Sequence, residues 1–281
     1  MKQIYILLIA LLMGLSANAE KSGSCGPNLK WHLTDDGVLT ITGNGEMDDY
    51  YIFSPWRDSD VKRIIIGNRV TTIGQTAFSG CSSLTSVTIP NSVTTIGGWA
   101  FSICSSLTSV TIPNSVTTIG DNAFMGCSSL ISVTIPNSVT TIGSEAFSDC
   151  TNLQKVNIGN SVKTIGEFAF NKCTNITQIS SEAVVPPTCE SGVFFYVNTS
   201  KCKLIVPKNS LDAYKQAYQW EDFSLIEGST TGITNTVYNK AGLADVYTID
   251  GTKRLSKAST DEINALPKGV YIVNDKKIII K

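Results

Sequence analysis

Five cysteines and one histidine are the residues whose types and positions could do chemistry in this chain. The cysteines recur every 23 residues, at Cys81, Cys104, Cys127, Cys150 and Cys173. This spacing lacks the paired C-x-x-C form of a zinc site, and no histidine accompanies it. In units that stack about 4.8 Å apart, such side chains point in the same direction, which favours packing over bridging. We therefore predict a column of buried free thiols, with no metal and no cofactor.

Three more cysteines lie outside this column. Cys189 and Cys202 flank a segment predicted to be a loop, so they are better candidates for a disulfide than the column cysteines. Cys25 lacks the small-residue context of a lipoprotein cleavage site. We therefore expect no lipid anchor at that position.

The single histidine, His32, is predicted to lie on a hairpin strand. A Ser/His/Asp or Cys/His catalytic site could be built only around this residue, and no nucleophile is marked by its local sequence. The carboxylate pairs Asp35-Asp36 and Asp48-Asp49 lie in predicted loops and lack the alternating oxygen ligands of a calcium loop. We therefore expect a structural or surface role for His32 and no enzymatic activity.

The column cysteines are spaced regularly because the chain repeats a 23-residue unit. The copies at 93–115 and 116–138 differ at only five places, and the pattern also covers 70–92 and 139–161. A looser copy starts at Val162, and a half copy precedes the array at Ile64 to Arg69. A fixed period of this length predicts a solenoid, in which each coil buries its apolar side only by stacking on its neighbours.

Each coil carries eight apolar positions and two alternating stretches. Val-Thr-Thr-Ile and Ser-Val-Thr-Ile have the period of strands that bury one face. Between them, the Ala-Phe step and the Ser-Ser-Leu step predict a short helical turn followed by a loop. The fold class is thus a β-rich solenoid with short helical turns on its convex side. The apolar positions of one coil are Val116, Ile119, Ala123, Phe124, Cys127, Leu130, Val133 and Ile135.

The repeat resembles the BspA-type leucine-rich repeats of bacterial surface proteins, whose units read close to V-T-S-I-G-x-x-A-F-x-x-C-x-x-L-x-x-V-x-I-P-x-S. The resemblance covers a solenoid of 23-residue coils at residues 61–184. It implies an N-terminal β-hairpin cap at 20–60, carried by Trp31 to Trp56, and a C-terminal cap with a strand and a helix at 185–227. Ser210 is placed as the N-cap of that helix. The family further implies adhesion to host matrix proteins or to other bacteria.

Both ends of the chain predict export. Residues 1–19 read as a signal peptide, with Lys2 before an apolar core and a small-residue cleavage site at Ala17-Asn18-Ala19. This apolar run is too short for a stable membrane span, and no later one approaches about 20 residues. We expect a secreted or cell-surface protein.

Residues 228–235 read as a linker, and 236–281 as a small all-β module with turns at Asp250-Gly251 and Asn274-Asp275. This tail resembles the sorting domains of the type IX secretion pathway. The resemblance implies surface attachment through the C-terminal module, and the alternative is a plain cap domain.

Charge excludes one class of partner. The formal net charge is −1, and no cluster of Lys and Arg occurs before the C-terminal region. Nucleic acid binding requires such a cluster to neutralise phosphates. We therefore expect an extracellular protein or glycan as the ligand.

Two surfaces of the solenoid could bind this ligand. The strand face carries hydroxyl groups, including Ser109 and Thr111, and lacks the Trp, Tyr and Arg that dominate binding hot spots. On the helical side, large apolar residues interrupt columns that are otherwise polar, which predicts an exposed patch. The alternatives for this patch are sequence drift or packing against the C-terminal module. The patch residues are Trp99, Ile103 and Met125. Phe168 occupies the same position of its coil as Trp99, two coils beyond the coil of Met125.

A third candidate site is the aromatic and acidic segment of the N-terminal cap, which contains Tyr50, Tyr51 and Trp56. For these residues the alternative is burial in the core. Taken together, the sequence predicts a surface protein that mediates protein–protein binding, with adhesion as the expected role. Glycan binding and a structural spacer without a ligand are the alternatives.

Overall fold

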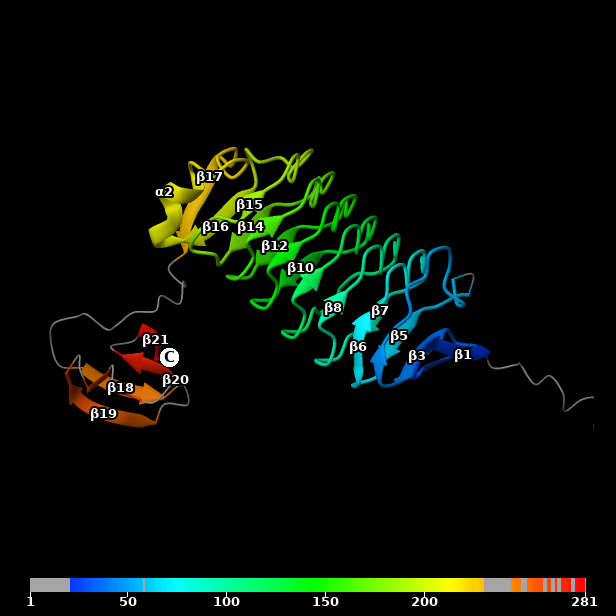
Figure 1. The fold of residues 1–281 in the computed structure, drawn as a ribbon. Coiled ribbons are helices and arrows are strands. Elements are labelled where there is room, and N and C mark those ends of the chain that lie inside the picture. The colour runs from blue at the N-terminus through cyan, green and yellow to red at the C-terminus, as the bar shows by residue number, and fades with distance from the viewer. Residues whose placement is uncertain are drawn as a thin grey trace, which may run out of the picture. The chain divides into compact units, whose positions relative to one another are not determined.

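The computed structural model describes residues 21–57, 59–229, 244–248, 252–259, 262–263, 266, 269–273 and 276–280. The chain divides into two compact units, Met1–Ser229 and Thr230–Lys281. The first unit contains the repeats, whose coils lie side by side along one axis (Figure 1). The predicted signal peptide at 1–19 lies outside the described residues.

The first unit begins with the hairpin cap that the sequence predicts. Strands β1 (Lys21–Gly26), β2 (Leu29–Leu33) and β3 (Val38–Gly43) pair antiparallel in this order. Gly37 closes the turn between β2 and β3 at φ +87°, where a Cβ would lie 2.4 Å from the carbonyl oxygen of Asp60. Strand β3 then pairs parallel with β5 (Arg63–Ile66), and β5 with β7 (Ser86–Thr88). The antiparallel cap therefore passes directly into the parallel stacking of the coils.

The Val-Thr-Thr-Ile stretches form one continuous parallel sheet. Each coil contributes a short strand whose isoleucine is buried, as the alternating pattern predicts. Neighbouring coils pair in register, Thr95 with Thr118 and Ile96 with Ile119 for example. The strands of this sheet, in spatial order, are β15 (Thr188–Cys189), β13 (Thr164–Ile165), β11 (Thr141–Ile142), β9 (Thr118–Ile119), β8 (Thr95–Ile96), β6 (Val70–Ile73) and β4 (Gly45–Glu46).

The Ser-Val-Thr-Ile stretches form a second face, which is interrupted at one coil. Residues 109–112 lie between β7 and the next sheet on this face and form no strand. Their one ladder contact is an isolated bridge from Ser109 to Ser132. Val87 and Val110 beside the interruption are half-buried, whereas Val133 and Val156 further along are buried. The sheet that follows contains β10 (Ser132–Ile135), β12 (Lys155–Ile158), β14 (Gln178–Ser181), β16 (Lys203–Pro207) and β17 (Leu225–Ser229).

The segment around each Ala-Phe step differs from the predicted helical turn. It is a run of hydrogen-bonded turns in which Trp99 (φ 53°) and Ile103 (φ 59°) adopt left-handed conformations. Successive amides alternate: Ala100 N–H donates to Gly97 O within its own coil, and Phe101 N–H donates to Ala123 O of the next coil at 2.7 Å. An α-helix would keep all these bonds inside one segment. The chain forms turns here because half of its amides stack the coils.

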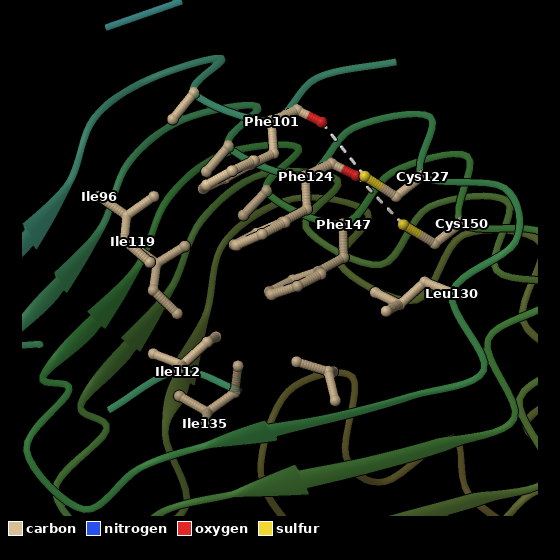
Figure 2. Close-up of a cluster of buried hydrophobic side chains, with 14 of the residues drawn as sticks. Ile96, Phe101, Ile112, Ile119, Phe124, Cys127, Leu130, Ile135, Phe147 and Cys150 are labelled. Atoms are coloured by element: carbon tan, nitrogen blue, oxygen red, sulfur yellow. Dashed lines mark hydrogen bonds between the residues drawn. The ribbon is translucent and has the colours of Figure 1, made fainter. Parts of the chain in front are cut away.

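A ladder of aromatic rings fills the core along the stacking axis (Figure 2). The rings of Phe101, Phe124 and Phe147 are fully buried, with successive centroids 5.3 and 5.2 Å apart and interplanar angles of 7° and 5°. Trp56 continues the ladder into the N-terminal cap, and Trp220 ends it in the C-terminal cap. One ring per coil thus joins the coils into a single core.

The column cysteines lie beside this ladder as buried free thiols, which confirms that prediction. The Sγ of Cys127 donates to the carbonyl oxygen of Phe101 at 3.2 Å, and Cys150 repeats the contact with Phe124 (Figure 2). Burial raises the pKa of both Cys81 and Cys127 to about 12. Both thiols therefore stay protonated at neutral pH, and Cys127 acts as a hydrogen-bond donor inside the core.

The predicted disulfide between Cys189 and Cys202 is wrong, because both cysteines are free and buried. Cys189 pairs in register with Ile165 on one sheet, whereas Cys202 directly precedes β16 on the other. Each cysteine fills an apolar position of its own coil. The chain departs from the 23-residue period in this region, so these apolar positions could not be recognised from the repeat.

A glycine after each Val-Thr-Thr-Ile strand allows the coils to stack closely. A Cβ added at Gly143 would lie 2.5 Å from the backbone nitrogen of Asp121 in the preceding coil. Real Cβ atoms do not approach backbone so closely. The repeated Ile-Gly dipeptide therefore reflects coil spacing as well as a turn.

The C-terminal cap of the first unit contains η1 (Lys208–Ser210), α2 (Leu211–Tyr214) and β17. Ser210 precedes α2 as predicted, but its hydroxyl makes no capping hydrogen bond and is buried without a partner. The predicted linker from residue 228 is also corrected, because β17 runs to Ser229 and pairs with β16 over its whole length. The rest of that linker lies outside the described residues.

The second unit is a four-stranded antiparallel sheet, in agreement with the predicted all-β module. Its strands are ordered β19 (Lys253–Ala258), β18 (Ala244–Thr248), β20 (Gly269–Val273) and β21 (Lys276–Ile280). Asp245 accepts hydrogen bonds from Lys253 Nζ at 2.7 Å and from the backbone N–H of Lys257 at 3.0 Å, and the lysine contact is the main reason that its pKa falls to about 2. The predicted turns at 250–251 and 274–275 lie outside the described residues.

Candidate functional site

The Ala-Phe turns of successive coils form a ridge along the first unit, which we call the turn ridge. It comprises residues 75–80, 98–103, 121–126, 144–149, 167–172 and 191–196. In the first five of these turns the alanine and phenylalanine of the step point into the core and are fully buried, and in the last turn Val193 and Phe194 are buried at the same positions. The left-handed residues that alternate with them lie at the surface. This alternation decides which side chains of the turns a partner can reach.

Trp99, Ile103 and Met125 lie on this ridge in two adjacent coils. Trp99 is 39% exposed and Ile103 is 53% exposed, whereas Met125 is half-buried. The backbone N–H of Ile103 donates to Met125 O at 2.6 Å, and the side chain of Ile103 lies 3.6 Å from where a Cβ of Gly126 would be. The glycine leaves the flank of Ile103 open. The structure therefore places Ile103 next to Met125, and Trp99 lies in the same turn as Ile103.

The N-terminal cap extends this apolar surface. Tyr51 is 87% exposed, and the Arg57 guanidinium lies 3.4 Å above the ring centroid of the exposed Phe53. Arg57 Nε also lies 3.7 Å from where a Cβ of Gly80 would be, and the N–H of Gly80 donates to Ser102 O in the coil of Trp99. The turn at 75–80 thus lies between the pair of Phe53 and Arg57 and the coil of Trp99.

Two of the predicted cap residues contribute to packing instead. Trp56 is fully buried and its indole N–H donates to Ala77 O at 2.9 Å, so it cannot contact a ligand. Tyr50 is half-buried against Trp56, with ring centroids 5.7 Å apart. Phe53 was not singled out by the sequence reasoning, although it follows Tyr51 closely in the same exposed segment.

A second aromatic cluster lies at the far end of the turn ridge. Phe168 is half-buried, and its ring packs on Gly192 and meets Phe195 edge-on at 6.4 Å. Phe195 and Tyr196 are exposed, with ring centroids 4.4 Å apart. Sequence reasoning found Phe168 and missed the other two, because the repeat loses its strict period before them. Phe195 nevertheless occupies a turn position that a hydrogen bond identifies, because Lys172 N–H of the preceding coil donates to Phe195 O, and Tyr196 takes the left-handed position that follows.

Ile103 is the most strained residue of the turn ridge. A β-branched residue at positive φ is a genuine outlier, and such a conformation costs about 1–3 kcal/mol. The same position is glycine in both neighbouring coils, at Gly80 and Gly126. Thr76 is also β-branched at φ 54°, but its hydroxyl donates to Tyr50 O. The aliphatic side chain of Ile103 has no such hydrogen bond, and the residue is 53% exposed.

The strand face presents a different surface. Ser109 and Thr111 are exposed and line a groove of about 450 Å³ together with Thr134 and Asn157. Asn157 Nδ2 donates to Thr134 Oγ1 at 3.2 Å. The groove offers hydroxyl and amide groups and no aromatic ring. Its chemistry differs from that of the turn ridge.

No group of His, Cys, Asp and Glu within the described residues could hold a metal ion. His32 lies on β2, opposite Ser22 on one side and Thr40 on the other. Among the described helices, none combines the length and the apolarity that a membrane span requires.

Comparisons with known proteins place the repeats in a family. A family model of the BspA type leucine rich repeat region matches residues 51–177 and 142–259, in six copies. No curated protein matches the chain.

Several solved structures are similar. A leucine-rich repeat protein from Eubacterium ventriosum is 23% identical with a TM-score of 0.54, and the match covers 68% of this chain and 67% of that one. The leucine rich repeat protein of T. pallidum is 28% identical with a TM-score of 0.50, covering 62% of this chain and 91% of that one. A leucine rich cell surface protein from Faecalibacterium prausnitzii is 26% identical with a TM-score of 0.41, covering 62% and 57%. With the matched repeats and the stacked coils that carry them, the chain belongs to the BspA-type leucine-rich-repeat family.

Proposed function

We propose that this chain is a secreted or cell-surface protein that binds another protein through the N-terminal half of its turn ridge. The observation that carries the proposal is Ile103, which is exposed in a left-handed conformation that glycine adopts in the adjacent coils. Residues retained against backbone strain concentrate at functional sites. Trp99 beside it is the residue type most enriched in binding hot spots.

Adhesion to a host or bacterial surface protein is the role that fits this surface best. The patch combines Trp99, Ile103 and Met125 with the exposed Tyr51 and Phe53 of the cap, which is an apolar composition that favours a protein partner over a sugar. Export through the leader at 1–19 and attachment through the C-terminal module would place this ridge outside the cell. The chain then needs no catalytic residues, cofactor or metal.

Glycan binding is the second candidate, and the groove on the strand face favours it. Its hydroxyl and amide groups, from Ser109, Thr111, Thr134 and Asn157, are the types that hydrogen-bond to sugars. The groove lacks an aromatic ring for stacking. A glycan array competed with free oligosaccharide tests this candidate, which predicts binding that is lost on changing Thr111 and unaffected by changing Trp99.

Replacing two patch residues with those that the next coil carries at the same positions tests the proposed protein-binding site. Trp99→Asn and Ile103→Gly introduce the residues that the next coil carries at these positions, so the fold accepts both. Each change should weaken binding to immobilised extracellular-matrix proteins by about 30-fold, because a hot-spot residue contributes about 2 kcal/mol or more. Surface plasmon resonance at two salt concentrations measures this, and the affinity should depend little on salt.

Thr111→Asn on the strand face is the matched control and should bind as the wild type does. Ile103→Gly should also raise the melting temperature, because it relieves backbone strain. Equal binding by the wild type and by both ridge variants would exclude the ridge as the site.

A further inference from the structure

We propose that the turn ridge also pairs with the turn ridge of a second copy of this chain, antiparallel about a two-fold axis between the coils of Asn122 and Glu145. The inference uses the surface of the proposed function and adds one partner to it. It rests on how large, small and charged residues alternate along the two left-handed columns of the ridge. The first column is Thr76, Trp99, Asn122, Glu145, Phe168 and Gly192, and the second is Gly80, Ile103, Gly126, Asp149, Lys172 and Tyr196.

Symmetry determines which residues would meet. Most homodimers are two-fold symmetric, so the same surface patch faces itself. A two-fold axis that lies in the interface and runs across the ridge places each column opposite its own reversed copy. The hydrogen bonds between coils keep the columns in register along the whole ridge, so the pairs can be read from their order.

The first column is complementary to its own reverse. Trp99 faces the partner's Phe168, and an aromatic pair adds about 0.5–1.5 kcal/mol beyond its buried area. Asn122 faces the partner's Glu145, whose carboxylate can accept a hydrogen bond from the amide. Thr76 faces the partner's Gly192, over which the ring of Phe168 in that copy packs. Trp99 is exposed and Phe168 is half-buried, and each ring of this aromatic pair would cover the other.

The second column is complementary as well. Tyr196 is large and exposed, and it faces the partner's Gly80, where Arg57 of the same copy lies beside the glycine and can contact the ring through its guanidinium. The aliphatic stem of Lys172 can lie on the partner's Ile103 while its ammonium group stays in water. Asp149 faces the partner's Gly126, so no carboxylate meets another across either column.

Charge disfavours the alternative two-fold pairing. An axis along the ridge would place the first column of one copy opposite the second column of the other within the same coil. Glu145 would then face the partner's Asp149, and like charges across an interface suppress association. The antiparallel arrangement avoids this repulsion and brings both aromatic clusters into contact.

The size of the ridge predicts a weak dimer. Six coils at about 4.8 Å span roughly 29 Å, and a strip roughly 12 Å wide buries on the order of 350 Å² per copy. A standard interface buries about 800 Å² per partner. Pairing should therefore be detected at high concentration, or between copies held close together on one surface.

Sedimentation equilibrium of the chain from residue 20 to 281, up to on the order of 1 mM, tests the proposal. The wild type should show a mass that rises with concentration, and Trp99→Asn and Phe168→Asn should each remain monomeric. Asn122→Lys should tighten association about fivefold, because two new ion pairs with the partner's Glu145 form per dimer at about 0.5 kcal/mol each. Adding Glu145→Lys to Asn122→Lys should make association weaker than in the wild type.

Asn114→Lys carries the same charge change on the strand face and should leave association unchanged. Circular dichroism and melting temperature establish that every variant is folded. A wild type that stays monomeric over this range overturns the pairing, and so does a dimer that responds equally to Asn122→Lys and Asn114→Lys. Neither result affects the binding of matrix proteins, so the two proposals fail separately.

Discussion

Replacing Phe124 with alanine should lower the free energy of unfolding by about 3–5 kcal/mol, the usual loss for a buried phenylalanine. The ring is fully buried and contacts the rings of Phe101 and Phe147 on its two sides, with centroids 5.3 and 5.2 Å away. In a solenoid each coil is stabilised only by its neighbours, so a cavity in a central coil weakens two interfaces at once. Urea titration followed by circular dichroism measures the loss.

Met125→Ala, one residue further along, is the matched control for this change. Met125 is half-buried on the ridge, and its backbone carbonyl, which the substitution retains, accepts the bond between coils. Met125→Ala should lower the free energy of unfolding much less than Phe124→Ala does. A Phe124→Ala variant that loses less than about 1 kcal/mol would show that the ladder does not hold the coils together.

Raising the pH above about 9 should destabilise the chain steeply through the buried thiols. The pKa of Cys81 and of Cys127 is about 12 in the folded chain, against 9.0 for the unperturbed thiol, because burial disfavours the thiolate. Their contribution is complete below the unfolded pKa and is lost as the pH rises toward the folded pKa, since only the unfolded chain ionises in this window. Each such thiol removes about 1.4 kcal/mol of stability per pH unit.

Comparison with Cys127→Ala isolates this effect from the ionisation of other groups. Between pH 9 and about 10.5 the free energy of unfolding of the variant should fall less steeply than that of the wild type, by about 1 kcal/mol per pH unit on average, because the unfolded thiol is half ionised at pH 9 and almost fully ionised at pH 10.5. Urea titrations under reducing conditions at several pH values give both slopes. Identical slopes would mean that Cys127 is accessible to water in the folded state.

The period of the repeat was enough to predict the core, because one set of contacts recurs in every coil. The columns of Phe124 and Cys127 are buried as predicted, and the thiols are free. Local propensity was not enough to predict the turns, because their left-handed residues are fixed by hydrogen bonds to the next coil. The interruption at 109–112 was also beyond sequence reasoning, since coils 70–92 and 93–115 share the same Ser-Val-Thr-Ile stretch.

The candidate site was predictable in part. Trp99 and Ile103 are large apolar residues at positions where the neighbouring coils carry small or polar ones. Comparison of the repeats in the sequence is enough to identify them. Trp56 could not be placed without the structure, because the cap lacks the repeat that separates buried from exposed positions. Phe195 and Tyr196 were missed for the same reason, since the insertion before them shifts the period.

Residue-resolved amide hydrogen exchange tests most directly whether the turn ridge is an ordered, stacked surface. Phe101 and Ile103 donate their amide hydrogens to the next coil at 2.7 and 2.6 Å, and Phe124 and Gly126 do the same at 2.8 Å. These four amides should exchange as slowly as those of the continuous sheet, with protection close to the global free energy of unfolding. Exchange at the rate of an unstructured peptide would contradict the stacked ridge, and with it both proposals that use this surface.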